Sequence, residues 1–276
     1  MSHFATAQPR ESGMPSQPAS DEVCSAPPLL AVVALGCERD ERWLFEGLDL
    51  SLHAGEILQV EGPNGSGKTT LLKILSGQFH DYEGEVLWRG QPTSRVRDDF
   101  LGSLLYLGHQ PGIKGTLTAL ENLAWYQALG GQPQAKSEAR SELAWAALDA
   151  VGLAGFEDVP AQQLSAGQQR RIALARLHLT PRRLWVLDEP FTAIDRDGVQ
   201  ALEALLLAHA QRGGSVVMTT HHRFSQASRL RRLCLGAKEG EKAEQGSEQG
   251  LEQRLEQGSE QGVGGKDTAS TQGASA

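Results

Sequence analysis

The chain has 276 residues, enough for one large domain, with 39% hydrophobic residues and a formal net charge of −8. Half of that charge lies in residues 237–276, and the central region keeps a charge near −2, which argues against bulk electrostatic binding of nucleic acid. The three cysteines, Cys24, Cys37 and Cys234, form no C-x-x-C pair, so neither a zinc site nor a redox motif is indicated. No apolar run is long enough to span a bilayer.

The two ends of the chain differ in composition from its middle. Residues 1–28 are rich in Ser, Pro, Ala and Gln, and they lack the basic start and the apolar stretch of a signal peptide. Residues 237–276 are acidic and repeat Glu-Gln-Gly. Such segments bury too little apolar surface to offset the entropy lost on ordering. We therefore predict a disordered extension over 1–28, a folded domain over 29–236 and a flexible tail over 237–276.

The folded region alternates short apolar runs with helical patterns. A helix is predicted over 69–75, and helical periodicity runs from Thr116 to about Val151, interrupted by Gly and Pro at 130–133. The predicted strands are 29–35, 43–52, 57–60, 84–88, 104–107, 184–187 and 215–220. This alternation predicts an α/β fold with a mainly parallel sheet and a helical insertion.

A phosphate-binding loop follows the third predicted strand and opens a helix, where the sequence GPNGSGKT fits the pattern G-x-x-x-x-G-K-[ST]. Glycines allow the backbone to point several N–H groups at one anion, Lys68 can reach the β- and γ-phosphates, and the Thr69 hydroxyl can ligate Mg²⁺. A glycine-rich turn with a chance lysine is the alternative, and the flanking strand and helix disfavour it. The residues predicted to bind ATP here are Gly62, Pro63, Asn64, Gly65, Ser66, Gly67, Lys68, Thr69 and Thr70.

A second motif places two carboxylates after an apolar strand. Residues 184–187 are followed by Asp188 and Glu189, as in a Walker B element. Asp188 is expected to hold Mg²⁺ through a water, and Glu189 to orient and polarise the attacking water. The two acids could instead be ordinary helix caps, which is the common role of acids at such positions. Their pairing with a phosphate-binding loop favours phosphoryl transfer.

A third motif, LSAGQ at 164–168, resembles the LSGGQ signature of ATP-binding cassette (ABC) ATPases, with one alanine replacing a glycine. The resemblance implies a P-loop NTPase of the ABC type, with a helical signature subdomain at about 112–175 and an antiparallel β portion. It also implies that Ser165 and Gly167 bind the γ-phosphate of ATP held by a second copy in a homodimer, and that Gln168 belongs to the same ATP-binding segment. A helix predicted over 168–179 would direct its positive end at that anion.

The remaining family motifs match one by one. Gln110 resembles the glutamine that contacts Mg²⁺ and water, residues 192–195 resemble the D-loop at the dimer interface, and His221 resembles the histidine that grips the γ-phosphate. The resemblance thus gives catalytic roles to Gln110 and His221 beside Lys68 and Glu189. A lone histidine is more often structural, and only its place after the strand at 215–220 favours His221.

One part of the family pattern is missing. ABC ATPases usually have an aromatic residue that stacks on adenine, at a position where this chain has residues 37–40. Trp43 and Phe45 come too late in the sequence. The guanidinium of Arg39 could stack on the base instead, so the adenine contact is left open.

Four longer strings resemble the CcmA family, the ATP-binding subunits of bacterial cytochrome c maturation systems, also called heme exporters. They are CERDER at 37–42, HQPGIK at 109–114, GLAGFED at 152–158 and EPFTAID at 189–195, and the likeness covers about residues 29–235. It implies an ATPase that lies peripherally on the cytoplasmic face of the inner membrane. Its partners would be the membrane subunit CcmB together with CcmC and the heme chaperone CcmE, and hydrolysis would be coupled to heme handling and chaperone release.

Two other functions fit the shared motifs. The chain could be the ATPase of another small-molecule exporter, or a soluble ABC ATPase of translation or DNA repair. The second is disfavoured because the chain has one cassette, no long heptad insertion, no zinc cysteines and no basic surplus. No Cys-x-x-Cys-His occurs, and no residue is assigned to heme.

Overall fold

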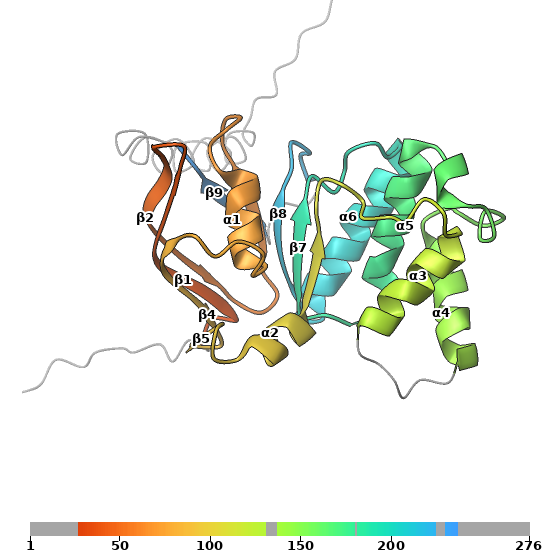
Figure 1. Cartoon of the computed structure of the whole chain (residues 1–276), viewed down its shortest axis with the longest axis horizontal. Coiled ribbons are helices and arrows are strands. Elements are labelled where there is room, and N and C mark those ends of the chain that lie inside the picture. The colour runs from red at the N-terminus through yellow and green to blue at the C-terminus, as the bar shows by residue number, and fades with distance from the viewer. Residues whose placement is uncertain (1–26, 131–136, 180, 225–229, 237–276) are drawn as a thin grey trace, which may run out of the picture.

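The computed structural model describes residues 27–130, 137–179, 181–224 and 230–236 (Figure 1). The acidic tail predicted for 237–276 lies outside the described residues, as does the extension predicted for 1–28 except for its last two positions. Each strand predicted from the sequence is present at or near its expected position, although the first one runs to Arg39, four residues further than expected.

A parallel sheet forms the centre of the molecule, as predicted, with strand order β6-β7-β8-β3-β9. Every residue of β7 and β8 is buried, as expected for a parallel sheet that is covered on both faces. Because all four strand pairings are parallel, the carboxyl ends of the strands meet at one edge of the sheet. The strands are β6 (Leu104–Leu107), β7 (Leu184–Asp188), β8 (Ser215–Thr219), β3 (Ile57–Glu61) and β9 (Leu230–Cys234).

An antiparallel sheet lies to one side, in the order β2-β1-β4-β5, and it confirms the predicted antiparallel portion. Asp40 and Glu41 both have positive φ, 51° and 59°, which permits the tight two-residue turn between β1 and β2. This turn carries the flanking residues Arg39 and Arg42 toward the phosphate-binding loop, as described below. The strands are β1 (Leu30–Arg39), β2 (Arg42–Leu52), β4 (Glu83–Trp88) and β5 (Gln91–Pro92).

Helix α1 (Lys68–Leu75) packs between the two sheets (Figure 1). Its buried side chains, Leu71, Leu72, Ile74 and Leu75, join inward-facing residues of both sheets in one apolar core. Helix α2 (Arg97–Ser103) was not predicted from the sequence. It adds Phe100 to this core, where the Phe100 ring contacts the Trp88 ring edge-on with 5.6 Å between the ring centres.

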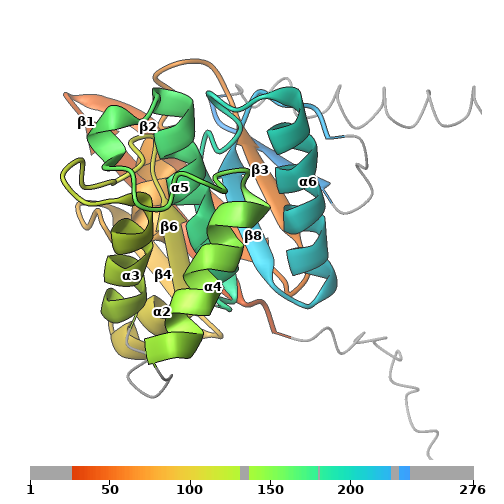
Figure 2. The same ribbon diagram turned by 90° about the vertical axis from the view of Figure 1, so that its right-hand side faces the viewer.

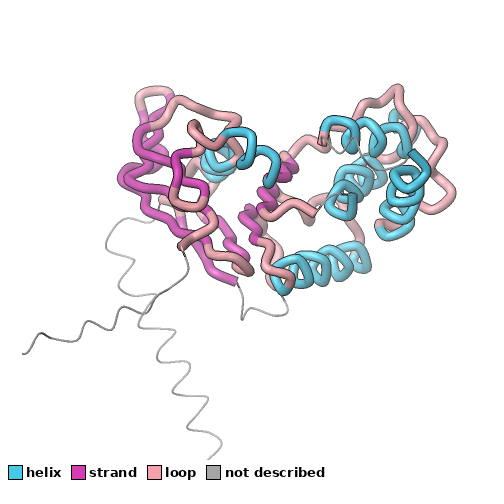
Figure 3. Tube along the Cα trace, turned by 90° about the horizontal axis from the view of Figure 1, so that it is seen from below, coloured by secondary structure: helices cyan, strands magenta, loops and turns pink. Residues whose placement is uncertain are grey.

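The other face of the parallel sheet is covered by α5 (Ala166–Leu179) and α6 (Arg196–Gln211), and these helices form a second apolar core with it. Helices α3 (Ala119–Leu129) and α4 (Ser137–Ala150) pack with α5 around a third apolar core (Figure 2). Seen from below, these helices lie at the opposite end of the molecule from the antiparallel sheet (Figure 3). Helix α5 therefore contributes to two cores, with Leu174 in one and Ile172 in the other.

Candidate functional site

The loop between β3 and α1 requires glycine for steric reasons at two positions. A Cβ on Gly62 would lie 2.5 Å from the carbonyl oxygen of Leu235, and a Cβ on Gly67 would lie 3.0 Å from Cβ of Leu44. Both residues also have positive φ, 146° and 92°. The loop is therefore a tight backbone cradle that ends directly at the first turn of α1.

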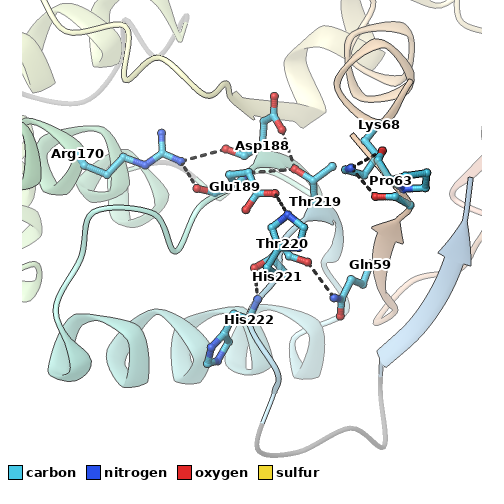
Figure 4. Close-up of polar contacts among 11 residues, drawn as sticks. Gln59, Pro63, Lys68, Arg170, Asp188, Glu189, Thr219, Thr220, His221 and His222 are labelled. Carbon is cyan, nitrogen blue, oxygen red and sulfur yellow. Dashed lines mark hydrogen bonds and ion pairs between the residues drawn. The ribbon is translucent and has the colours of Figure 1, made fainter. Parts of the chain in front are cut away.

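The cradle is suited to an anion. Helix α1 begins at Lys68, its N-cap residue Gly67 supplies no side-chain cap, and its first turn has no acidic residue, so its N–H groups and its positive dipole end are available to a phosphate. The Ser66 hydroxyl is buried and has no hydrogen-bond partner in the described part of the chain. Lys68 Nζ donates to the carbonyl oxygens of Gly62 and Pro63, at 2.7 and 3.1 Å (Figure 4). The ammonium is thus held over the loop that would carry the phosphates.

The loop borders a cavity of about 730 Å³ at the carboxyl edge of the parallel sheet. Residues from five separate parts of the sequence surround it: the β1–β2 turn with the start of β2, the phosphate-binding loop with the start of α1, the loop after β6, the end of β7 and the end of β8. The lining residues are Arg39, Asp40, Arg42, Leu44, Asn64, Gly65, Gly67, Lys68, Thr69, Thr70, His109, Asp188, Glu189, Thr219 and His221. The cavity thus brings together the predicted Asp188, Glu189 and His221 with six of the nine predicted residues of the phosphate-binding loop, whereas Gly62, Pro63 and Ser66 do not line it.

Asp188 is the last residue of β7, and the two oxygens of its carboxylate have different surroundings. Its Oδ1 accepts a hydrogen bond of 2.6 Å from the Thr219 hydroxyl, whereas Oδ2 is buried and has no partner among the described residues. A buried carboxylate oxygen without a donor would be costly unless a cation or water satisfies it. The described residues contain no group of three or more His, Cys, Asp or Glu side chains placed to hold a metal ion. One carboxylate beside a hydroxyl such as that of Thr69 fits Mg²⁺, which is usually bound by one or two protein oxygens and substrate phosphates.

Glu189 follows with an unusual backbone conformation, a positive φ of 49°. Its N–H donates to the Thr219 hydroxyl at 3.0 Å and to the Thr219 carbonyl oxygen at 3.1 Å. Its Oε1 lies 3.7 Å from Nε2 of His221, and the side chains of the two residues are 23% and 78% exposed, respectively (Figure 4). The carboxylate is thus largely sheltered at the cavity wall, whereas the imidazole is mostly exposed beside it.

Thr219 is a site residue that the sequence analysis missed. Its hydroxyl bonds to both acids of the Walker B pair, because Asp188 and Thr219 lie side by side in the parallel pairing of β7 with β8. The available signal was a hydroxyl residue at the end of the strand that precedes His221.

Other predicted site residues lie away from the cavity. Gln110 is exposed in the loop after β6 and does not line it, although His109 does. At the start of α5, the Ser165 hydroxyl accepts from the N–H of Gln168, while the Gln168 side chain accepts from the N–H of Ser165, which is a reciprocal capping box. Neither these two residues nor Gly167 line the cavity of their own chain. They form the N-terminus of a different helix, α5, whose positive dipole end attracts anions.

The region expected to contact adenine is lined by guanidinium groups. Arg39 and Arg42 lie at the cavity wall together with Leu44. Phe45 is buried, with its ring packed against the backbone of Gly67, and Trp43 faces a different surface groove. Neither aromatic residue lines the cavity, whereas the two arginines and Leu44 do.

Known proteins similar to this chain point to one family. The family model described as "ABC transporter" matches residues 45–192. Two curated relatives carry the name "Cytochrome c biogenesis ATP-binding export protein CcmA". The protein from Hahella chejuensis is 53% identical, and the alignment covers 76% of this chain and 97% of the relative. The protein from Pseudomonas putida is 54% identical, and the alignment covers 75% of this chain and 96% of the relative. The Escherichia coli K12 protein of that name is 53% identical over 75% and 96%.

Solved structures show the same fold. The dimeric structure of MJ0796, described as a bacterial ABC transporter cassette, is 26% identical with a TM-score of 0.66, covering 75% of this chain and 97% of that one. A dimeric post-hydrolysis state of the same cassette, bound to ADP and phosphate, has a TM-score of 0.65 at 26% identity, over 76% and 97%. Within the described residues, no helix has the length and hydropathy required to cross a bilayer.

Proposed function

This chain belongs to the CcmA family of ABC transporter ATP-binding subunits, which makes it the ATP-hydrolysing subunit of a cytochrome c biogenesis exporter, and we propose that it works through a two-protomer ATPase cycle. The observation that supports this cycle is the cavity at the carboxyl edge of the parallel sheet. It collects the phosphate-binding loop, both acids of the Walker B pair and His221, whereas the signature residues lie elsewhere on the same chain.

In the proposed bound state, the phosphates of ATP lie in the cradle of residues 62–70. Backbone N–H groups at the start of α1 and the buried Ser66 hydroxyl donate to phosphate oxygens. Lys68 exchanges its bonds to the carbonyls of Gly62 and Pro63 for bonds to the β- and γ-phosphates. Arg39 stacks its guanidinium on the adenine, with Arg42 and Leu44 beside it.

Mg²⁺ would be held by the Thr69 hydroxyl, by Gln110 and, through a water, by Asp188, whose Oδ2 has no partner among the described residues. When bound, the ion would offset negative charge on the β- and γ-phosphate oxygens. Thr219 fixes the other oxygen of Asp188 and so sets the direction of the free one. Gln110 lies outside the cavity wall, so its loop must move inward before its side chain reaches this position.

Hydrolysis is assigned to Glu189. Its carboxylate orients a water and withdraws the water proton as the oxygen bonds to the γ-phosphorus and the bond to the bridging oxygen breaks, which leaves ADP and phosphate. His221, 3.7 Å from this carboxylate, donates to a γ-phosphate oxygen. Lys68 and His221 thereby offset the charge that develops on the transferred group.

The second copy is proposed to complete the site with Ser165, Gly167 and Gln168. The capping box between Ser165 and Gln168 fixes the start of α5. The positive dipole end of this helix would then face the incoming anion. Two similar solved cassettes are described as dimers. We propose a homodimer with two competent sites, because both halves of the site are present in this chain.

The proposed location is the cytoplasmic face of the bacterial inner membrane, with CcmB as the membrane subunit and with CcmC and the heme chaperone CcmE in the same complex. The family name, which specifies cytochrome c biogenesis and export, supports this assignment. ATP hydrolysis would then drive heme handling and release of the loaded chaperone.

Affinity purification from detergent extract tests these partners. We expect the tagged chain to retain a CcmB-like membrane protein through washing, and the retained complex to hydrolyse ATP. A Glu189→Gln variant purified in parallel controls for binding that does not depend on turnover. Retention of ribosomes, or of an unrelated permease in place of CcmB, would contradict the assignment.

A further inference from the structure

Arg170 is a buried cation that the site described above does not use. It lies in the first turns of α5, directly after the signature residues, and its side chain is oriented toward the end of β7 (Figure 4). Only 5% of the residue is exposed. A buried guanidinium requires several acceptors to offset the loss of its hydration, so its partners indicate what it is for.

Four backbone carbonyl oxygens accept hydrogen bonds from Arg170. Nη2 donates to the carbonyl oxygens of Asp188 and Glu189, at 3.0 and 2.7 Å. Nη1 donates to those of Gly108 and His109, at 2.9 and 3.3 Å. One side chain therefore connects the signature helix, the Walker B pair and the loop that leads into Gln110. Each of these three segments contains or borders residues that the sequence analysis assigned to the site.

The planar guanidinium suits this position better than an ammonium would. Its two Nη groups diverge, so each can serve a different pair of carbonyls, whereas a lysine presents one point charge at the end of its chain. Burial lowers the pKa of Arg170 from its usual value, and the carboxylates of Asp188 and Glu189 oppose that shift. The group is therefore a fixed positive charge behind the two acids.

Glu189 has the backbone that most needs such support. Its positive φ of 49° is a conformation that side-chain-bearing residues rarely adopt, and it persists only where the surroundings hold it. The Thr219 side chain and backbone hold its N–H, and Arg170 holds its C=O. The peptide groups on both sides of the catalytic carboxylate are thus clamped by residues from two different elements.

We propose that Arg170 is a positioning residue that ties the orientation of Glu189 to the placement of α5 and of the Gln110 loop. A displacement of either segment moves donors or acceptors of this network and so moves the backbone of Glu189. The rate of hydrolysis then depends on the position of α5 and of the helices packed against it, in addition to nucleotide binding. The inference rests on the proposed role of Glu189 as the residue that activates water.

The test replaces Arg170 with methionine and uses Arg176→Met as the matched control. Arg176 lies on the same helix, with its guanidinium 3.6 Å from the Tyr126 ring centre and one bond of 3.4 Å to the Tyr106 carbonyl, and it contacts neither acid of the Walker B pair. Both changes remove a sheltered cation from α5. Melting temperature, Kd for ATP and kcat are measured for each purified variant.

We expect Arg170→Met to lower kcat about a hundredfold while Kd for ATP changes less than about threefold, because small displacements of a catalytic group affect turnover more than binding. Arg176→Met should keep kcat within about threefold of wild type at a similar loss of melting temperature. Arg170→Lys keeps the charge but can donate to only one carbonyl pair, so its kcat should lie between those of Arg170→Met and wild type. If the methionine variant does not fold, the lysine variant provides the test. An unchanged kcat in both Arg170 variants, or an equal fall in Arg176→Met, would overturn the inference.

A double variant separates this inference from the function on which it rests. If Arg170 acts through Glu189, adding Arg170→Met to Glu189→Gln should lower the residual kcat no further. A full additional loss would mean that Arg170 acts by another route. Wild-type turnover in Glu189→Gln alone would instead refute the role of Glu189, whereas a slow Glu189→Gln beside a normal Arg170→Met would refute only the positioning role.

Discussion

Replacing Thr219 with valine would remove one hydroxyl from the Walker B pair and leave the shape of the side chain almost unchanged. Both residues are β-branched, so β8 should keep its packing. The hydroxyl donates to Asp188 Oδ1 at 2.6 Å and accepts from the N–H of Glu189 at 3.0 Å. Since the other oxygen of Asp188 has no partner among the described residues, the variant would leave a buried carboxylate without any donor from them.

The magnitude follows from these two bonds. Losing a hydrogen bond to a charged group costs about 1.5–3 kcal/mol, and the buried acceptor is then unsatisfied. The Glu189 N–H loses less, because it keeps its 3.1 Å bond to the Thr219 carbonyl oxygen. We therefore expect the free energy of unfolding to fall by about 2 kcal/mol, equivalent to a decrease in melting temperature of about 4–8 °C for a domain of this size.

Thr219→Ser is the matched control, since it keeps the hydroxyl and loses only a methyl group. Melting curves of the two variants and of wild type are compared without nucleotide, and ATPase rates are then measured over a range of Mg²⁺ concentrations. Because Asp188 would no longer be oriented, Thr219→Val should need roughly tenfold more Mg²⁺ for half-maximal rate. A valine variant that matches the serine variant in both melting temperature and Mg²⁺ requirement would refute the reasoning.

Glu189→Gln should bind ATP, trap a dimer on gel filtration and lose about a thousandfold in kcat, because the amide cannot accept a proton; turnover near the wild-type rate would contradict its role. Ser165→Arg should abolish turnover while one chain still binds ATP, and persistent ATPase activity would show that the signature does not complete a site in trans. Burial lowers the pKa of His209 to about 4, with a smaller contribution from Arg212. The unfolded chain thus takes up a proton near pH 6.5 and the folded chain does not, so stability is complete above pH 6.5 and falls by about 3 kcal/mol as the pH drops to 4. Denaturant unfolding at pH 7 and 4.5 should show this fall diminished in His209→Gln, and an equal fall in that variant would exclude His209 as its source.

The parallel sheet and the phosphate-binding loop could be predicted because their information is local. Residues 57–60 and 184–187 are short, mainly apolar runs, and each lies within one residue of its chemical motif. The predicted helix at 168–179 begins two residues earlier in the structure, at Ala166, where Ser165 and Gln168 form the cap. Position and chemistry could both be predicted there because neighbouring residues determine them.

Elements with mixed patterns were missed. Strand β9 contains two arginines and is only half-buried at the sheet edge, so it lacks the apolar run of a central strand. Helix α6 was not predicted, although the Asp195 side chain caps it by accepting from the N–H of Gly198 at 3.0 Å. In the sequence analysis that aspartate was interpreted only as part of a dimer motif.

The supporting contacts of the site depend on tertiary register. Arg170 and Thr219 contact the Walker B pair from segments 18 and 31 residues away, and no spacing rule predicts such bonds. Residues whose types suit phosphoryl transfer could therefore be predicted from the sequence, whereas the residues that hold them in place could not. Supporting residues of this kind have no sequence signature of their own, because their role depends on which carbonyl and carboxylate oxygens the fold places beside them.

The shared position of α5 has a mechanical consequence. Alternate faces of this one helix complete the core against the parallel sheet and the core of the helical group, with Leu174 and Leu177 on one side and Ile172 and Leu179 on the other. The helical group cannot peel away as a separate body without uncovering the sheet or splitting its own interior. Heat and denaturant should therefore melt both parts in one cooperative transition, and any tilting during the ATPase cycle must be a small rigid rotation about an intact, doubly anchored axis.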